Sequence, residues 1–143
     1  MRRLKHQVHL AAVVSLLLGV VMVSAQTSTK LVGDIPFDFH VGQTTLPSGQ
    51  YTVKFGYPTA GVICIQSQDG ARSAMTQTIS LTPGKQDGVA KLVFNQYGTS
   101  YFLSQAWNPS HSIARGVLKT KAEMEVARNA RNPQATVVAL EKR

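Results

Sequence analysis

The sequence predicts an all-β fold, an antiparallel β-sandwich or partly closed barrel of about seven to eight strands with one C-terminal amphipathic helix. After a polar arm, short apolar segments alternate with turns rich in glycine, proline and aspartate at intervals of about 8–14 residues. Side chains also alternate within the segments: Tyr51, Val53 and Phe55 share one strand face, and Thr52 and Lys54 share the other. This two-residue period is typical of half-buried strands.

Each apolar segment bounded by turn residues predicts one strand. The expected strands cover residues 33–39, 50–56, 61–67, 73–81, 89–96, 100–107 and 112–118, with a final strand at 135–140. Residues 62–65 are apolar on both faces, so this segment is the best candidate for a central strand. In the first strand, Ile35, Phe37 and Phe39 are expected to alternate inward.

One segment has the period of a helix instead. Residues 120–123 (Thr-Lys-Ala-Glu) fit a capping box, in which the Thr hydroxyl and the Glu carboxylate satisfy exposed amides of the first turn. Ala122, Val126 and Ala130 then recur at four-residue spacing, and an Asn-Pro pair closes the segment. We therefore expect an amphipathic helix near 120–131.

Residues 1–25 predict a secretory signal peptide. Basic residues precede an apolar stretch at 10–23, and a Val-Ser-Ala cleavage motif ends at Ala25. The apolar stretch is shorter than the roughly 20 residues of a spanning helix, and no second stretch of that length follows, so no transmembrane segment is expected after cleavage. We expect residues 26–143 to form a single β-sandwich domain, periplasmic or extracellular.

Charge is concentrated near the C-terminus. The predicted signal peptide holds three of the 15 basic and none of the seven acidic residues, so the expected formal charge of the mature chain is +5. Residues 115–143 carry seven basic and three acidic side chains, against five and four in residues 26–114. The expected partner is an envelope protein or an anionic surface polymer that meets the C-terminal quarter. Nucleic acid is not expected, because the chain is exported and shows no nucleic-acid module.

The sequence predicts no catalytic residue, cofactor or metal site, and no enzyme. It lacks a nucleophile elbow, a zinc-protease helix, a phosphate loop and a dinucleotide fingerprint. After cleavage only His40 and His111 remain, far apart in sequence and without other ligands nearby. Asp34 and Asp38 share a face of their expected strand but would lie about 13 Å apart, beyond the roughly 9.5 Å limit of a glycosidase pair. The single cysteine, Cys64, is expected to be buried and unpaired.

An aromatic segment is the one candidate for ligand binding. Tyr97 occupies a turn, and the expected strand after it carries Tyr101, Leu103, Gln105 and Trp107 on one face. If exposed, this face suits sugar rings or another apolar ligand. The alternative is that the face is core and that Trp107 caps the sandwich.

Four segments carry a resemblance to a known group of proteins. They are residues 35–39 (I-P-F-x-F), 41–42 (V-G), 46–53 (L-P-x-G-x-Y-x-V) and 101–107 (Y-F-L-x-x-x-W). With these motifs the chain resembles a group of small exported β proteins common among acidobacteria. The group has no established activity, so the resemblance implies export and a β fold and transfers no functional residue.

Two functions follow from these observations. The first is a non-enzymatic protein of the cell envelope or secretome that acts as an interaction or structural module, with a role for its basic C-terminal helix. The second is a small-ligand or glycan-binding module that uses the aromatic surface near Tyr101 and Trp107, with Tyr97 beside it.

Overall fold

A computed structural model describes residues 30–82 and 88–143, so the predicted signal peptide lies outside the described residues. The described chain is mostly β and contains one α-helix, α2 (Lys121–Asn129), and a short 3-10 turn, η1 (Pro109–His111). The strands are β1 (Leu31–Ile35), β2 (Phe39–Val41), β3 (Thr44–Leu46), β4 (Gly49–Phe55), β5 (Val62–Ser67), β6 (Ser73–Ser80), β7 (Lys91–Tyr97), β8 (Ser100–Asn108), β9 (Ile113–Val117), β10 (Gln134–Ala139) and β11 (Glu141–Lys142).

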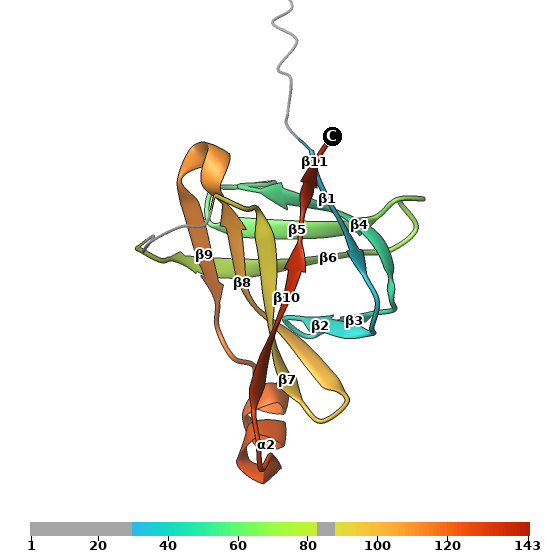
Figure 1. Ribbon diagram of the computed structural model, residues 1–143, viewed down its shortest axis with the longest axis vertical. Coiled ribbons are helices and arrows are strands. Elements are labelled where there is room, and N and C mark those ends of the chain that lie inside the picture. The colour runs from blue at the N-terminus through green and yellow to red at the C-terminus, as the bar shows by residue number, and fades with distance from the viewer. Residues whose placement is uncertain (1–29, 83–87) are drawn as a thin grey trace, which may run out of the picture.

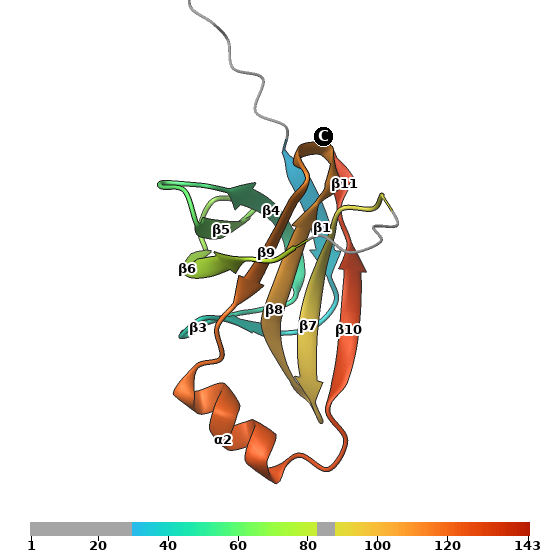
Figure 2. The same ribbon diagram turned by 90° about the vertical axis from the view of Figure 1, so that its left-hand side faces the viewer.

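The strands form one mixed sheet that is not closed. Its path runs β10-β7-β8-β9-β6-β5-β4-β1-β11, and β2 and β3 lie off this path. Strand β6 joins the two halves, because residues 73–77 pair with β5 and residues 78–80 pair with β9. In Figure 1, β4, β5 and β6 run across the direction of β7, β8 and β10, so the sheet folds over on itself. Figure 2 shows α2 beyond the end of β7 and β8.

The last segment of the chain touches both ends of the sheet path. Strand β10 pairs with β7 along its whole length, and the following β11 pairs with β1. Between them the Leu140 amide donates to the Ala90 carbonyl at 2.8 Å, and the Arg143 amide then donates to the Lys30 carbonyl at 2.9 Å. Gly33 of β1 makes this approach possible, because a Cβ there would lie 2.5 Å from Leu140 Cδ2.

The core lies between the two halves of the folded sheet. Phe39 is central to it, with ring centroids 5.1 Å from Tyr51 and 5.5 Å from Phe94, both in edge-to-face geometry. Around these rings pack apolar side chains from both halves, among them Ile35, Val53, Ile63, Ile65, Leu92, Leu103 and Leu140. The motif residues at 35–39 and 46–53 thus contribute largely to packing.

The strands expected after residue 50 all overlap observed strands. The segment expected to be central, residues 62–65, lies in β5, which is hydrogen-bonded on both sides by β4 and β6. Cys64 within it is buried and free, as expected. In the described part of the chain, no helix has the length and apolar character needed to cross a membrane.

The prediction of one strand at 33–39 is wrong, because this segment contributes to two strands. Strand β1 ends at Ile35 and β2 begins at Phe39. Pro36 has no amide proton to give to a sheet ladder, and the Asp38 side chain accepts a hydrogen bond from the Ser48 amide, ten residues away, at 2.9 Å. The chain therefore changes direction here, and Asp34 and Asp38 do not share one strand.

The purely antiparallel arrangement is also not found. Strand β2 pairs in parallel with β8 at His40 and Phe102, while pairing antiparallel with β3. The break at Pro36 lets β2 leave the β1 direction and reach β8. Strand β3 was not predicted from the sequence, because three residues are too few to show an apolar period.

We predict that Gly33→Ala lowers the free energy of unfolding by about 1–3 kcal/mol, because the added methyl meets a buried leucine in a packed core. Urea denaturation of the single variant measures the effect. The double variant with Leu140→Ala is the control: removing the leucine methyl should make the second change at Gly33 nearly neutral. Simple additivity of the two changes would contradict the close packing of β1 against the last segment.

Candidate functional site

Helix α2 and the β7–β8 hairpin form the candidate site. The Thr120 hydroxyl caps the helix by accepting a hydrogen bond from the Glu123 amide at 3.1 Å, as the capping box predicts. The helix ends at Asn129, and the chain then runs through Arg131 to β10. The segment from Thr120 to Arg131 therefore joins β9 to β10 across the end of the sheet (Figure 2).

The Glu123 carboxylate does not fold back on the helix as the capping box predicts. It is only 3% exposed, and its Oε1 accepts hydrogen bonds from Asn95 Nδ2 at 2.8 Å and from the Tyr97 hydroxyl at 3.1 Å. Asn95 and Tyr97 are two residues apart on β7, so both side chains emerge from the same face of the sheet. One carboxylate thus fastens the helix to the sheet through two neutral donors.

This bond affects the chemistry of Tyr97. Burial raises the pKa of the Tyr97 hydroxyl above its usual value, and the nearby negative charge of Glu123 raises it further. The Lys119 ammonium acts in the opposite direction and is weaker. The hydroxyl is therefore held in its protonated form, which is the form that donates to Glu123.

The inward face of α2 differs from the predicted apolar stripe. Ala122 is exposed, whereas Val126, Ala127 and Ala130 are half-buried beside the buried Glu123. The face of α2 that contacts the sheet is thus rotated by about one residue from the predicted face, and the Glu123 carboxylate lies at its N-terminal end. Sequence periodicity missed Glu123 because its partners lie 26 and 28 residues away in the chain.

Burial of Glu123 changes the charge that the helix region presents to solvent. Lys119, Lys121, Arg128 and Arg131 are all exposed, and Glu125 is the exposed carboxylate among them. The sequence count treats Glu123 as a further surface anion. In the structure its charge faces the sheet, so the outer surface of this segment is more basic than the sequence indicates.

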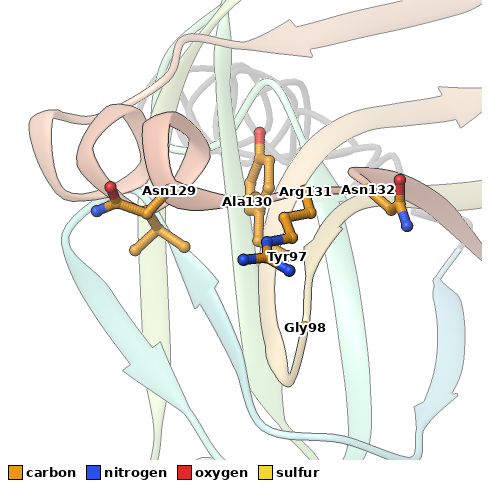
Figure 3. Close-up of a pocket in the computed structure, with 7 residues that line it drawn as sticks. Tyr97, Gly98, Asn129, Ala130, Arg131 and Asn132 are labelled. Carbon is orange, nitrogen blue, oxygen red and sulfur yellow. The ribbon is translucent and has the colours of Figure 1, made fainter.

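A groove of about 570 Å³ lies between the end of the helix and the β7–β8 hairpin. Its walls come from the hairpin turn, from the last turn of α2 and from the segment that follows. They are lined by Tyr97, Gly98, Val126, Asn129, Ala130, Arg131 and Asn132. Figure 3 shows the Asn129, Arg131 and Asn132 side chains placed along the helix end and the segment after it. Arg131 is the charged member of this set.

The three predicted aromatic residues do not share one surface. Tyr97 is buried beneath α2, with 6% of its surface exposed. Tyr101 stacks on Phe37, with ring centroids 3.8 Å apart and planes 12° from parallel. Trp107 is half-buried at the other end of β8, about 20 Å from Tyr101 along an extended strand.

A β-bulge explains why the expected face is divided. Gln105 pairs with Val93, but Leu103 already pairs with the next residue, Phe94, so Ser104 is the extra residue. Leu103 and Ala106 consequently both face the core. The prediction that Tyr101, Leu103, Gln105 and Trp107 share one strand face is therefore wrong.

Trp107 has its own partners on the far side of the bulge. Its indole Nε1 donates to Gln105 Oε1 at 2.9 Å. The Lys91 ammonium lies 5.7 Å from the centre of its ring, within cation–π range. These contacts hold the ring on β8 away from the groove at α2.

The His40 and His111 rings each contact a neighbouring side chain. The His40 ring stacks on Phe102 at 4.4 Å, and its Nδ1 lies 2.9 Å from Thr45 Oγ1. His111 Nδ1 lies 3.3 Å from Asn108 Nδ2. Within residues 30–82 and 88–143, no group of three or more His, Cys, Asp or Glu side chains is arranged to hold a metal ion.

Comparisons with known proteins add no relative: no protein-family model, no curated protein and no solved structure matches this chain.

We predict that Glu123→Ala lowers the free energy of unfolding by roughly 2–4 kcal/mol, because it leaves the buried Tyr97 hydroxyl and the half-buried Asn95 amide without their charged acceptor. Glu125→Ala is the matched control: the same change two residues away on the exposed side should stay within about 0.5 kcal/mol. Urea denaturation of both variants gives the comparison. Equal effects would show that Glu123 does not fasten the helix.

We also predict a pH dependence that comes from Tyr97. Its raised pKa means that the folded protein keeps the phenolic proton to higher pH than the unfolded chain. This contribution is fully present below the ordinary tyrosine pKa of about 10 and is lost as the pH rises through the folded value. As the pH rises through that range, the free energy of unfolding should fall more steeply for the wild type than for Tyr97→Phe. The lysines titrate in both proteins, so the difference between the two curves comes from Tyr97. Parallel curves would refute the effect.

Proposed function

We propose that the mature chain is a non-enzymatic interaction module, exported to the periplasm or beyond, that binds an anionic surface polymer through the segment from Lys119 to Arg131. In this proposal the strands fold as a sandwich or partly closed barrel that serves as a rigid support. The observation that carries the proposal is the burial of Glu123, which removes one anion from a surface where four basic side chains are exposed.

The positions of these charges on the helix support the proposal. Lys121 and Arg128 are seven residues apart, which is close to two turns, so they lie on one side of α2 about 10 Å apart along its axis. Glu125 lies between them and offsets part of their charge. Arg131 follows directly after the helix and extends the basic surface toward the groove.

A polymer fits this surface better than a small anion would. Exposed lysine and arginine side chains a helical turn or more apart each contribute little alone, because water and salt screen them. A chain with repeated charges can contact several of them at once, and each contact after the first is intramolecular. The proposed partner is therefore an acidic polysaccharide of the envelope rather than a free ion.

Charge variants test the proposal directly. Lys121→Gln or Arg128→Gln should each weaken binding to immobilised polygalacturonate about fivefold, corresponding to about 1 kcal/mol per basic residue near an anionic surface. Glu125→Gln should strengthen binding by a similar factor. Affinity should also fall steeply as salt is added.

Two controls make this result specific. Arg72 is an exposed arginine in the β5–β6 turn, and Figure 1 places that turn away from α2. Arg72→Gln makes the same charge change and should leave the affinity unaltered. Neutral dextran should not bind. An equal loss of affinity in Lys121→Gln, Arg128→Gln and Arg72→Gln would mean that only the net charge matters, and the proposal would be wrong.

A further inference from the structure

We propose that the groove beside the end of α2 is a binding site for one carboxylate-bearing sugar unit, such as a uronic acid residue of the acidic polymer. This inference rests on the proposed function and names what the site would recognise. The groove volume of about 570 Å³ lies in the range of small-ligand sites, which is roughly 300–1,000 Å³.

The charge of the lining selects an anion. Of the seven lining residues only Arg131 is charged, so no carboxylate of the lining opposes a bound anion. A guanidinium presents two parallel N–H donors that match the two oxygens of a carboxylate. Arg128 carries the same guanidinium and is also exposed, but it does not line the groove.

The remaining polar groups favour a ligand that also carries hydroxyls. The last carbonyls of a helix lack intrahelical donors, and they form the negative end of its dipole. Here the Ala130 amide donates to the Ala127 carbonyl at 3.3 Å, which leaves neighbouring carbonyls of the last turn as acceptors. The Asn129 Nδ2 already donates to the Glu125 carbonyl at 3.4 Å, so Asn129 offers its amide oxygen as an acceptor, and the Asn132 amide lines the rim beside it. Sugar hydroxyls can donate to the carbonyls of the last turn, whereas a simple inorganic anion such as sulfate has no donor to offer them.

The apolar part of the groove suits the C–H face of a sugar ring. Val126 and Ala130 are half-buried in its wall, and Tyr97 lies beneath. Gly98 has φ +61°, and a Cβ built there would meet no atom within 4 Å. The hairpin turn therefore leaves its side of the groove open to a ring, and the apolar wall limits the water that competes for Arg131.

Charge-conserving variants test the inference, because they separate recognition in the groove from general attraction. Trigalacturonate is titrated into the purified protein and into the Arg131→Lys and Arg72→Lys variants. We expect Arg131→Lys to weaken binding roughly tenfold or more, because lysine loses the paired hydrogen bonds. Arg72→Lys makes the same arginine-to-lysine change in the β5–β6 turn, away from the groove, and should bind like the wild type.

The ligand is varied in the same experiment. The methyl-esterified trisaccharide keeps the ring and hydroxyls but lacks the charge, and it should bind as weakly as Arg131→Lys binds the free acid. NMR titration should shift the amide signals of Gly98 and Ala130 with the acid. Equal affinities of the two lysine variants, or tighter binding of sulfated dextran oligomers than of the uronate, would overturn the inference.

The two proposals fail in different ways. If the glutamine variants of Lys121 and Arg128 weaken polymer binding but Arg131→Lys does not, the basic surface acts without a specific site and only the groove inference is wrong. If none of these variants alters binding to polygalacturonate, the proposed function is wrong as well.

Discussion

The hydrogen bonds between the Glu123 carboxylate and two side chains of β7 organise the whole region around α2. They attach the helix to the face of the sheet that carries Asn95 and Tyr97. Because the helix is only nine residues long, it has little stability of its own and depends on such tertiary contacts. The position of the helix in turn forms one wall of the groove and sets which side chains face solvent.

This attachment also affects how the chain returns to the sheet. Helix α2 stands between β9 and β10, and β10 pairs with β7, the same strand that provides the partners of Glu123. Fastening the helix near the end of β7 therefore places Gln134 where pairing with Gln96 can begin. From there the chain follows β7 to Leu140, and β11 then pairs with β1 at the other end of the sheet path. One buried carboxylate thus supports both the basic surface and the final pairing step.

The sequence predicted features that depend on neighbouring residues and missed those that depend on distant ones. The alternation at Tyr51 and Val53 and the Thr120 cap are local patterns, and the structure contains both. The bulge beside Leu103 results from how β8 pairs with β7, and no residue of β8 marks it. The inward turn of Glu123 has the same cause. A Thr-x-x-Glu pattern is compatible with a carboxylate that caps its own helix. Here the carboxylate binds Asn95 and Tyr97 of the sheet instead.

The neutral partners of Glu123 bear directly on function. A buried carboxylate can be balanced by a cation or by neutral donors, and a cation would most readily come from the basic residues of the same segment. Here an amide and a phenol serve instead, and the raised pKa of Tyr97 keeps that phenol protonated as a donor. The anion is thus accommodated without drawing Lys121, Arg128 or Arg131 away from the surface. The fold thus separates the acidic group that stabilises the helix from Lys121, Arg128 and Arg131, which remain exposed.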